Sequence, residues 1–100
     1  MDLQAFQGSL NEPMPPRELA PALKALWYEA KDDWQRAHAL VQDEDDRDCA
    51  WVHAYLHRKE GDLSNAGYWY RRAHKPVAEL TLREEWEAIV QALLLATADD

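Results

Sequence analysis

The amino-acid sequence predicts an all-α fold of about five helices arranged in antiparallel hairpins. Apolar residues recur at intervals of three and four through most of the chain, as they do on the buried face of an amphipathic helix. Residues that end helices separate these stretches, because Gly61 and Pro76 each follow a periodic segment. No segment alternates apolar and polar residues between glycine-asparagine turns, so we expect no β-sheet.

Capping signals place the helix boundaries. Asp32 and Gln35 form one capping-box pattern, and Thr81 and Glu84 form another. Gly61 is suited to a left-handed C-terminal position, with Asp62 capping the next helix. The five expected helices run from about Pro16 or Pro21 to Lys31, from Asp33 to about Gln42, from Arg47 to Glu60, from Leu63 to about His74, and from the Thr81–Glu84 box to about Ala96.

The first sixteen residues differ in composition from the rest. They contain Gly8, Ser9 and Asn11, followed by three prolines between Pro13 and Pro16. Proline lacks an amide donor and fixes its own φ. We therefore expect an extended or flexible N-terminal arm over residues 1–16, and a single helical-hairpin domain over residues 17–100.

Charge and cysteine usage narrow the function classes. The formal net charge is −8 and the pI is near 4.8, which argues against binding to nucleic acids or to anionic membranes. The chain has one cysteine, Cys49, so an internal disulfide cannot form, and we expect a reducing, cytoplasmic location. No apolar run approaches the roughly 18 residues of a membrane span. Cys49 beside anionic Asp48 is expected to be a buried apolar residue rather than a nucleophile.

Two helical hairpins repeat at an offset of about 29 residues. In each, a small residue lies in the first helix, a short turn follows, and a small residue and a bulkier one lie in the second helix. The matching pairs are Ala25 and Ala54, Asp32 and Gly61, Asp33 and Asp62, Ala37 and Ala66, and Val41 and Tyr70.

The second hairpin resembles a tetratricopeptide repeat in its small–Gly–small–aromatic–small spacing, which is carried by Ala54, Gly61, Ala66, Tyr70 and Ala73. The stretches from Ala25 to Lys31, from Trp34 to His38, from Ala50 to Asp62 and from Asn65 to Ala73 also resemble a group of short, uncharacterised microbial and fungal proteins. These resemblances imply a right-handed stack of hairpins, with the last helix as the first half of a third repeat. They imply no particular activity.

The third helix carries the first candidate site. In tetratricopeptide geometry, its side with Trp51, Tyr55 and Arg58 would face the concave groove. An aromatic pair beside an arginine suits a carboxylate or a peptide end. Our leading hypothesis is therefore a non-enzymatic scaffold that binds a protein or peptide partner. The alternative for these residues is structural, with Trp51 packed under the N-terminal arm and Arg58 neutralised by a carboxylate.

His53 and His57 stand one helical turn apart, a spacing that zinc sites use. The residue after the first histidine is Ala54, where a zinc-protease helix would have its general base, and spacing shows no third ligand. We therefore expect a structural histidine pair packed against the fourth helix, with no bound metal and no cofactor. A small-molecule or enzymatic site is the alternative function, and its residues would be His53, His57, Arg58, Asn65, Tyr68 and Arg71.

Gly67 and the leucines of the last helix each predict a further contact. Gly67 lies inside the fourth helix, where it costs about 1 kcal/mol relative to alanine, so we expect a close backbone or ligand approach to offset it. Leu93, Leu94 and Leu95 fan around the last helix, and one face cannot bury all three. A homodimer through the C-terminal helix, centred on Leu95, is therefore a third hypothesis, in which the role is structural.

Overall fold

The computed structural model describes residues 1–98, and over that range it contains helices and no strand. The all-helical prediction is confirmed. The described residues form six helices rather than about five: α1 Leu3–Ser9, α2 Pro21–Ala30, α3 Trp34–Val41, α4 Arg47–Glu60, α5 Leu63–Ala73 and α6 Leu82–Ala98.

Most boundaries lie where the capping signals place them. The C-terminal residue of α4 is followed by Gly61 in the left-handed conformation, with φ at 91°. The capping box before α6 is also present, since Thr81 and Glu84 exchange hydrogen bonds of 3.0 and 3.1 Å. The expectation for α3 was wrong by one residue. Asp33 rather than Asp32 caps it, because Asp32 takes a positive φ of 66° in the turn.

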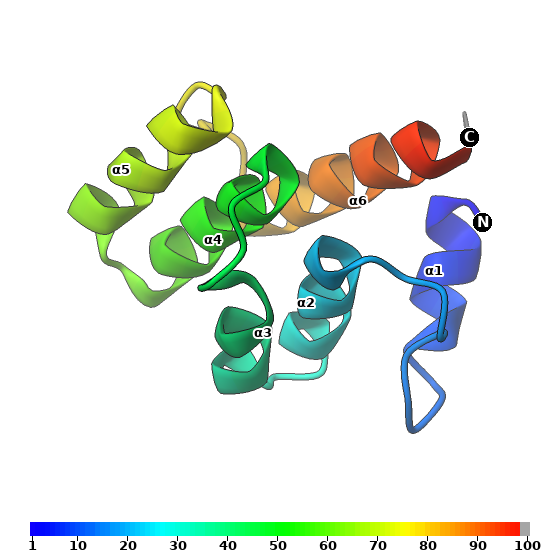
Figure 1. The fold of residues 1–100 in the computed structure, drawn as a ribbon. Helices are drawn as coiled ribbons and strands as arrows, with labels where there is room; N and C mark the ends of the chain where they lie inside the picture. Colours follow the sequence, from blue (N-terminus) through cyan, green and yellow to red (C-terminus); the bar gives the residue numbers. More distant parts are fainter. Residues whose placement is uncertain (99–100) are drawn as a thin grey trace.

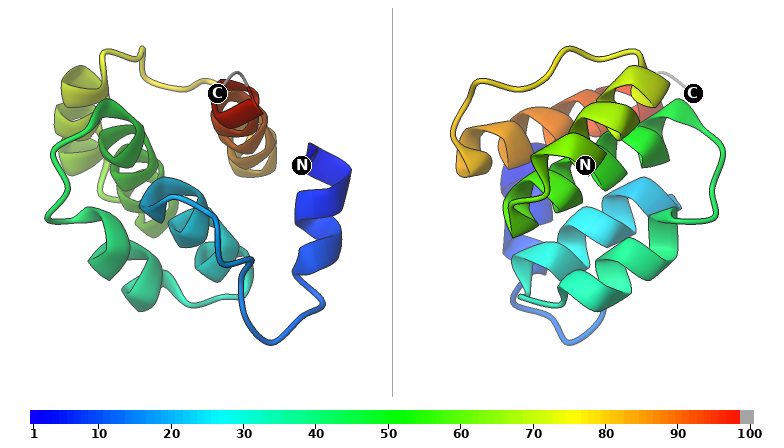
Figure 2. Two further views of the ribbon diagram at one scale, coloured as in Figure 1. Left: turned by 45° about the vertical axis from the view of Figure 1, so that its right-hand side comes forward. Right: turned by 90° about the vertical axis from the view of Figure 1, so that its left-hand side faces the viewer.

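The helices form two neighbouring pairs with a long helix across them (Figure 1). α2 packs beside α3, and α4 packs beside α5, each pair joined by a short turn. α6 contacts α1, α2 and α4. In the left view of Figure 2, α3 and α5 lie on one side of α2 and α4, whereas α1 and α6 lie on the other. α4 therefore has neighbours on several sides, as its apolar pattern predicts.

The N-terminal segment is a correction to the sequence prediction. Residues 3–9 are helical rather than extended, with Asp2 accepting a 2.8 Å hydrogen bond from the Ala5 amide as the N-cap. Phe6 is fully buried, and its ring centroid lies 5.8 Å from that of Trp86 on α6. A helix of seven residues is marginal alone. Burial of Phe6 in the main core stabilises it, so the arm belongs to the same domain.

The main core lies between α2, α4 and α6, and it is filled by large side chains with almost no exposure, among them Leu26, Trp27, Val52, Leu56 and Ile89. Cys49 is buried, as expected, and burial raises the pKa of its thiol. Leu93 and Leu94 are buried while Leu95 is 69% exposed. No helix in the described part of the chain combines the length and apolar character that crossing a bilayer requires.

Gly67 is not explained by a close approach. A Cβ built on it would meet the Arg71 guanidinium at an ordinary 3.8 Å, and no backbone lies nearer. We therefore expect Gly67→Ala to raise the free energy of unfolding by about 0.5–1 kcal/mol, because alanine has the higher helix propensity. Chemical denaturation checks this value. Gly61→Ala is the control and should destabilise, since its φ is positive. A loss of stability in Gly67→Ala would contradict the expectation.

Candidate metal centre

Three histidines meet where α3 packs on α4. His53 and His57 lie one turn apart on α4, and both are buried, with 3% and 6% of their surface exposed. His38 comes from the facing side of α3 and is half-buried. Each of the three imidazoles places one ring nitrogen within 4.8 Å of a nitrogen on each of the others. We call His38, His53 and His57 the histidine cluster.

Among the ring nitrogens of the histidine cluster, one that is fully buried has no hydrogen-bond partner. His53 Nε2 lies 3.0 Å from His38 Nε2, so one of these rings donates a hydrogen bond to the other. His57 Nδ1 lies 2.6 Å from the Glu60 carboxylate. His53 Nδ1 is buried and has no hydrogen-bond partner. A buried polar atom without a partner costs about 1–3 kcal/mol, so the cluster is not fully satisfied by its own contacts.

Two tryptophans enclose the histidine cluster. Trp34 stacks on His38 with an interplanar angle of 8°, and its indole N–H donates a 2.9 Å bond to the Leu56 carbonyl on α4. Trp69 on α5 stacks on His53 with ring centroids 3.9 Å apart. These flat contacts hold the orientation of two of the three imidazoles.

Burial keeps two members of the histidine cluster, His38 and His53, uncharged. It lowers the pKa of His53 to about 4, and the nearby rings of His38 and His57 lower it further. Burial also lowers the pKa of His38, and the nearby His57 ring lowers it further. Metal ions bind the neutral form of imidazole. At pH 7, therefore, His38 and His53 already have the protonation state that a metal ligand needs.

The distance between His38 and His53 is close to that between two ligands of a tetrahedral metal ion. Zinc–nitrogen bonds of about 2.0–2.1 Å place two ligand nitrogens about 3.3 Å apart. The observed 3.0 Å between His38 Nε2 and His53 Nε2 needs an opening of a few tenths of an ångström. Glu60 on His57 Nδ1 matches the carboxylate that commonly orients a metal-binding imidazole and leaves Nε2 free to coordinate.

Sequence reasoning missed His38, Trp34 and Trp69. A spacing signal existed for the first two, because Trp34 and His38 are four residues apart and share one face of α3. The same interval separates His53 and His57 on α4. Consecutive helices in a stack of hairpins face one another, so two such faces could have been paired. Trp69 lies on a third helix, and no spacing rule relates it to His53.

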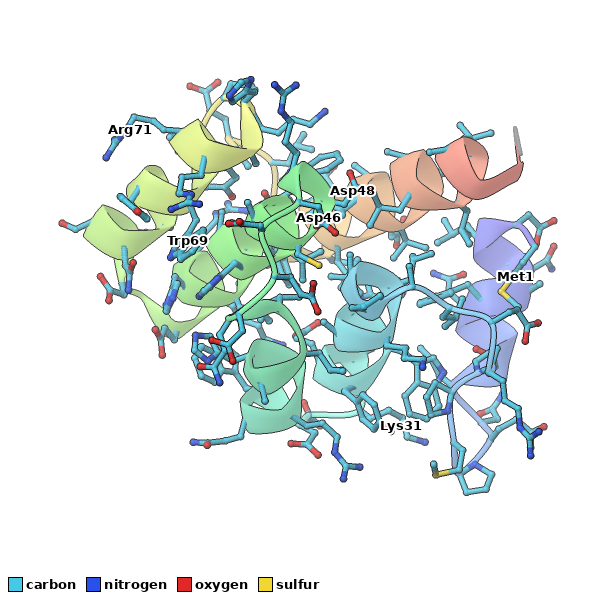
Figure 3. The ribbon with its side chains drawn as sticks, in the orientation of Figure 1. Met1, Lys31, Asp46, Asp48, Trp69 and Arg71 are labelled. Carbon is cyan, nitrogen blue, oxygen red and sulfur yellow. The ribbon has the colours of Figure 1, made fainter. Side chains whose placement is uncertain are left out.

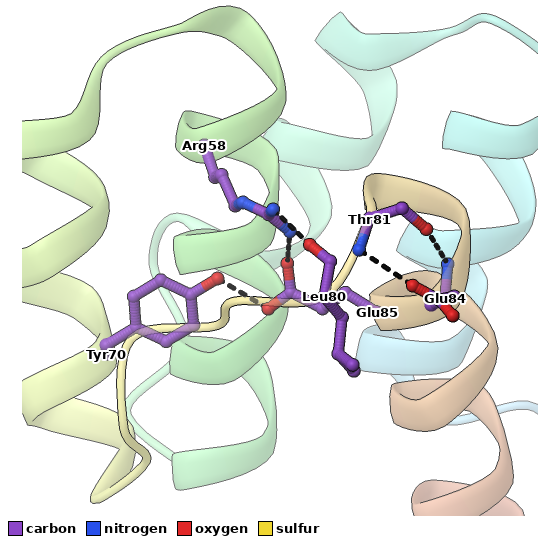
Figure 4. Close-up of polar contacts among 6 residues, drawn as sticks. All are labelled: Arg58, Tyr70, Leu80, Thr81, Glu84 and Glu85. Carbon is purple, nitrogen blue, oxygen red and sulfur yellow. Dashed lines mark hydrogen bonds and ion pairs between the residues drawn. The ribbon is translucent and has the colours of Figure 1, made fainter.

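The structure does not combine Trp51, Tyr55 and Arg58 into one open groove. Trp51 is half-buried, lies under the Lys75 ammonium at 4.2 Å, and lines a hollow of about 460 Å³ beside residues 75–80. Tyr55 is buried and lines a different cavity. Arg58 forms an ion pair of 2.7 Å with the buried Glu85 (Figure 4). Arg58 therefore has the structural role given as the alternative, in which a carboxylate neutralises its charge.

The residues of the alternative site are also separated. His53 and His57 lie together in the cluster, but Tyr68 is 44% exposed on α5 and accepts a 3.0 Å bond from Arg72. Arg71 is exposed and projects away from the body of the protein (Figure 3). Asn65 lies in the first turn of α5, where its backbone amide bonds to the capping Asp62.

Comparison of the chain with protein-family models, with curated protein sequences and with solved structures finds no match.

Proposed function

We propose that this domain binds one divalent transition-metal ion through His38, His53 and His57. The observation that carries the proposal is the convergence of three imidazoles, two of them on one helix face and the third on the facing helix. Imidazole nitrogen suits zinc, copper and nickel, whereas calcium and magnesium prefer oxygen. The sequence alone favours a structural role for the pair His53 and His57. The third imidazole, from His38, is the reason to propose a metal site instead.

A bound ion would connect two parts of the fold. His38 belongs to the pair α2–α3, whereas His53 and His57 belong to the pair α4–α5. α3 is short, and Ala37 and Val41 are its fully buried residues, whereas Trp34 and Leu40 are partly buried against the core. Coordination would hold α3 on α4 in the native state alone, and it would therefore stabilise folding.

The test is metal content and stability of the purified chain. After loading with zinc and dialysis, we expect one equivalent of zinc by elemental analysis. At a free zinc concentration of a hundred times Kd, the free energy of unfolding should rise by about 2.7 kcal/mol. His38→Asn and His53→Asn should each lose the bound zinc. Cu²⁺, which is open-shell, should quench the emission of Trp34 and Trp69, since these indoles stack on the cluster.

His74→Asn is the matched control. His74 is exposed, follows α5 in the left-handed conformation that asparagine tolerates, and lies outside the cluster. This variant should keep full zinc binding. Zinc retained by His38→Asn, or lost equally by His74→Asn, would show that the ion binds elsewhere and would contradict the proposal.

The arrangement of the pairs as a right-handed, tetratricopeptide-like stack is also proposed. Ala25, Ala37, Ala54 and Ala66 support it, since these matched small residues are all at most 2% exposed where helices approach closely. A partner-binding scaffold and a homodimer through Leu95 remain predictions of the sequence. Under both, the metal ion would stabilise the scaffold.

A further inference from the structure

A cavity of about 560 Å³ opens between α1, α2, α4 and α6, on the side of α4 away from the histidine cluster. Tyr55 and Lys59 line it, and each is two residues from a clustered histidine, which is about 200° around a helix. Small-molecule sites commonly have volumes of about 300–1,000 Å³. The cavity is therefore large enough for a small organic molecule and separate from the metal centre.

The wall of this cavity contains a buried carboxylate. Glu29 on α2 is 3% exposed, and its carboxylate forms an ion pair with the ammonium of Lys59 on α4. A buried carboxylate requires a cation or several donors to offset its lost hydration. Lys59 is the more exposed partner, with 38% of its side chain accessible. Its long, flexible stem allows it to leave Glu29 without disturbing the backbone.

Aromatic and aliphatic side chains complete the wall. Tyr55 and Trp86 line the same cavity as Glu29, together with Leu10 and Leu82. Burial and the neighbouring Glu29 carboxylate raise the pKa of Tyr55. Aromatic rings attract cations, and the effect is larger where water is excluded. A carboxylate beside two aromatic residues therefore favours a cation with an apolar body.

We propose that this cavity binds an organic ammonium ion, whose charged group replaces the Lys59 ammonium on Glu29. The apolar body of the ligand would lie against Tyr55 and Trp86. The net charge of −8 attracts cations to the protein surface. An anionic ligand has weaker support, because both cations that line the cavity are already paired, Lys59 with Glu29 and Arg83 with Glu87.

Isothermal titration with two probes of similar size and opposite charge tests this proposal. On the wild-type protein, 2-phenylethylammonium should bind at least about tenfold more tightly than 3-phenylpropanoate. Equal binding of the two probes, or no binding of the ammonium at millimolar concentration, would overturn the proposal. This comparison needs no variant.

Two variants then locate the charge. Lys59→Met removes the competing ammonium and should tighten binding of 2-phenylethylammonium by about tenfold, whereas Glu29→Gln should abolish it. Arg72→Met is the matched control, because it also removes one cation of a salt bridge, with Asp45, but Arg72 lies outside the cavity. It should leave binding unchanged. Retained affinity in Glu29→Gln would show that the carboxylate is not the site, and the proposal would fail.

Discussion

Substitution of Arg58 by methionine should lower the free energy of unfolding by about 3–5 kcal/mol, the range seen when one partner of a buried ion pair is removed. Glu85 on α6 is 3% exposed, and Arg58 donates a 2.7 Å bond to one of its oxygens. The other oxygen accepts a 2.5 Å bond from the Tyr70 hydroxyl (Figure 4). Arg58 also donates to the Leu80 carbonyl. Methionine would leave the carboxylate with Tyr70 alone, so urea denaturation should show the loss directly.

Arg83→Met is the control for this substitution. Arg83 also pairs with a carboxylate from α6, but its side chain is 84% exposed, and such pairs contribute at most about 1 kcal/mol. A double-mutant cycle adds a second check. Glu85→Gln removes the buried charge, so it should cost less in the Arg58→Met protein than in the wild type. Additive losses, or a loss in Arg58→Met no larger than in Arg83→Met, would mean that Arg58 does not neutralise Glu85.

Local sequence signals were sufficient to predict the helix ends that are capped by residues next to them in the sequence. The bounds of α4 follow from Gly61 and the apolar pattern, and the start of α6 follows from the Thr81–Glu84 box. α1 could not be found in this way. It depends on Phe6 entering a core whose other residues come from distant helices. Tertiary packing decided the structure of the N-terminal segment, where glycine and proline content had predicted an arm.

The candidate sites show the same division between local and distant contacts. The His53–His57 pair is a property of one helix and was visible in the sequence. His38 joins it only because α3 packs on α4, so the cluster needs the tertiary fold. Arg58 was placed in a groove because its helix face has aromatic neighbours. Its real partner, Glu85, lies 27 residues away, and no helical spacing relates the two.

Acid should destabilise the metal-free protein between pH 6.5 and 4 through His53. An unfolded histidine has a pKa of 6.5, whereas burial lowers the pKa of His53 in the folded chain to about 4. Between these values the unfolded chain binds a proton that the folded chain does not. Stability from this group is therefore complete above pH 6.5 and is lost as the pH falls towards 4. This difference between the folded and unfolded pKa of His53 corresponds to about 3 kcal/mol in the free energy of unfolding.

Denaturation curves from pH 7.5 to 4.5 in a chelator, for the wild type and His53→Asn, measure this effect. Other groups also titrate in this range, and the lowered pKa of His38 acts in the same direction, so the difference between the two proteins is the quantity of interest. The variant should lose less stability on acidification than the wild type. With zinc present, the wild-type slope should become steeper, because protons then also compete with the ion for the imidazoles. Parallel curves in the chelator would contradict a neutral, buried His53. A zinc-independent slope would leave that protonation state intact and argue only against the metal.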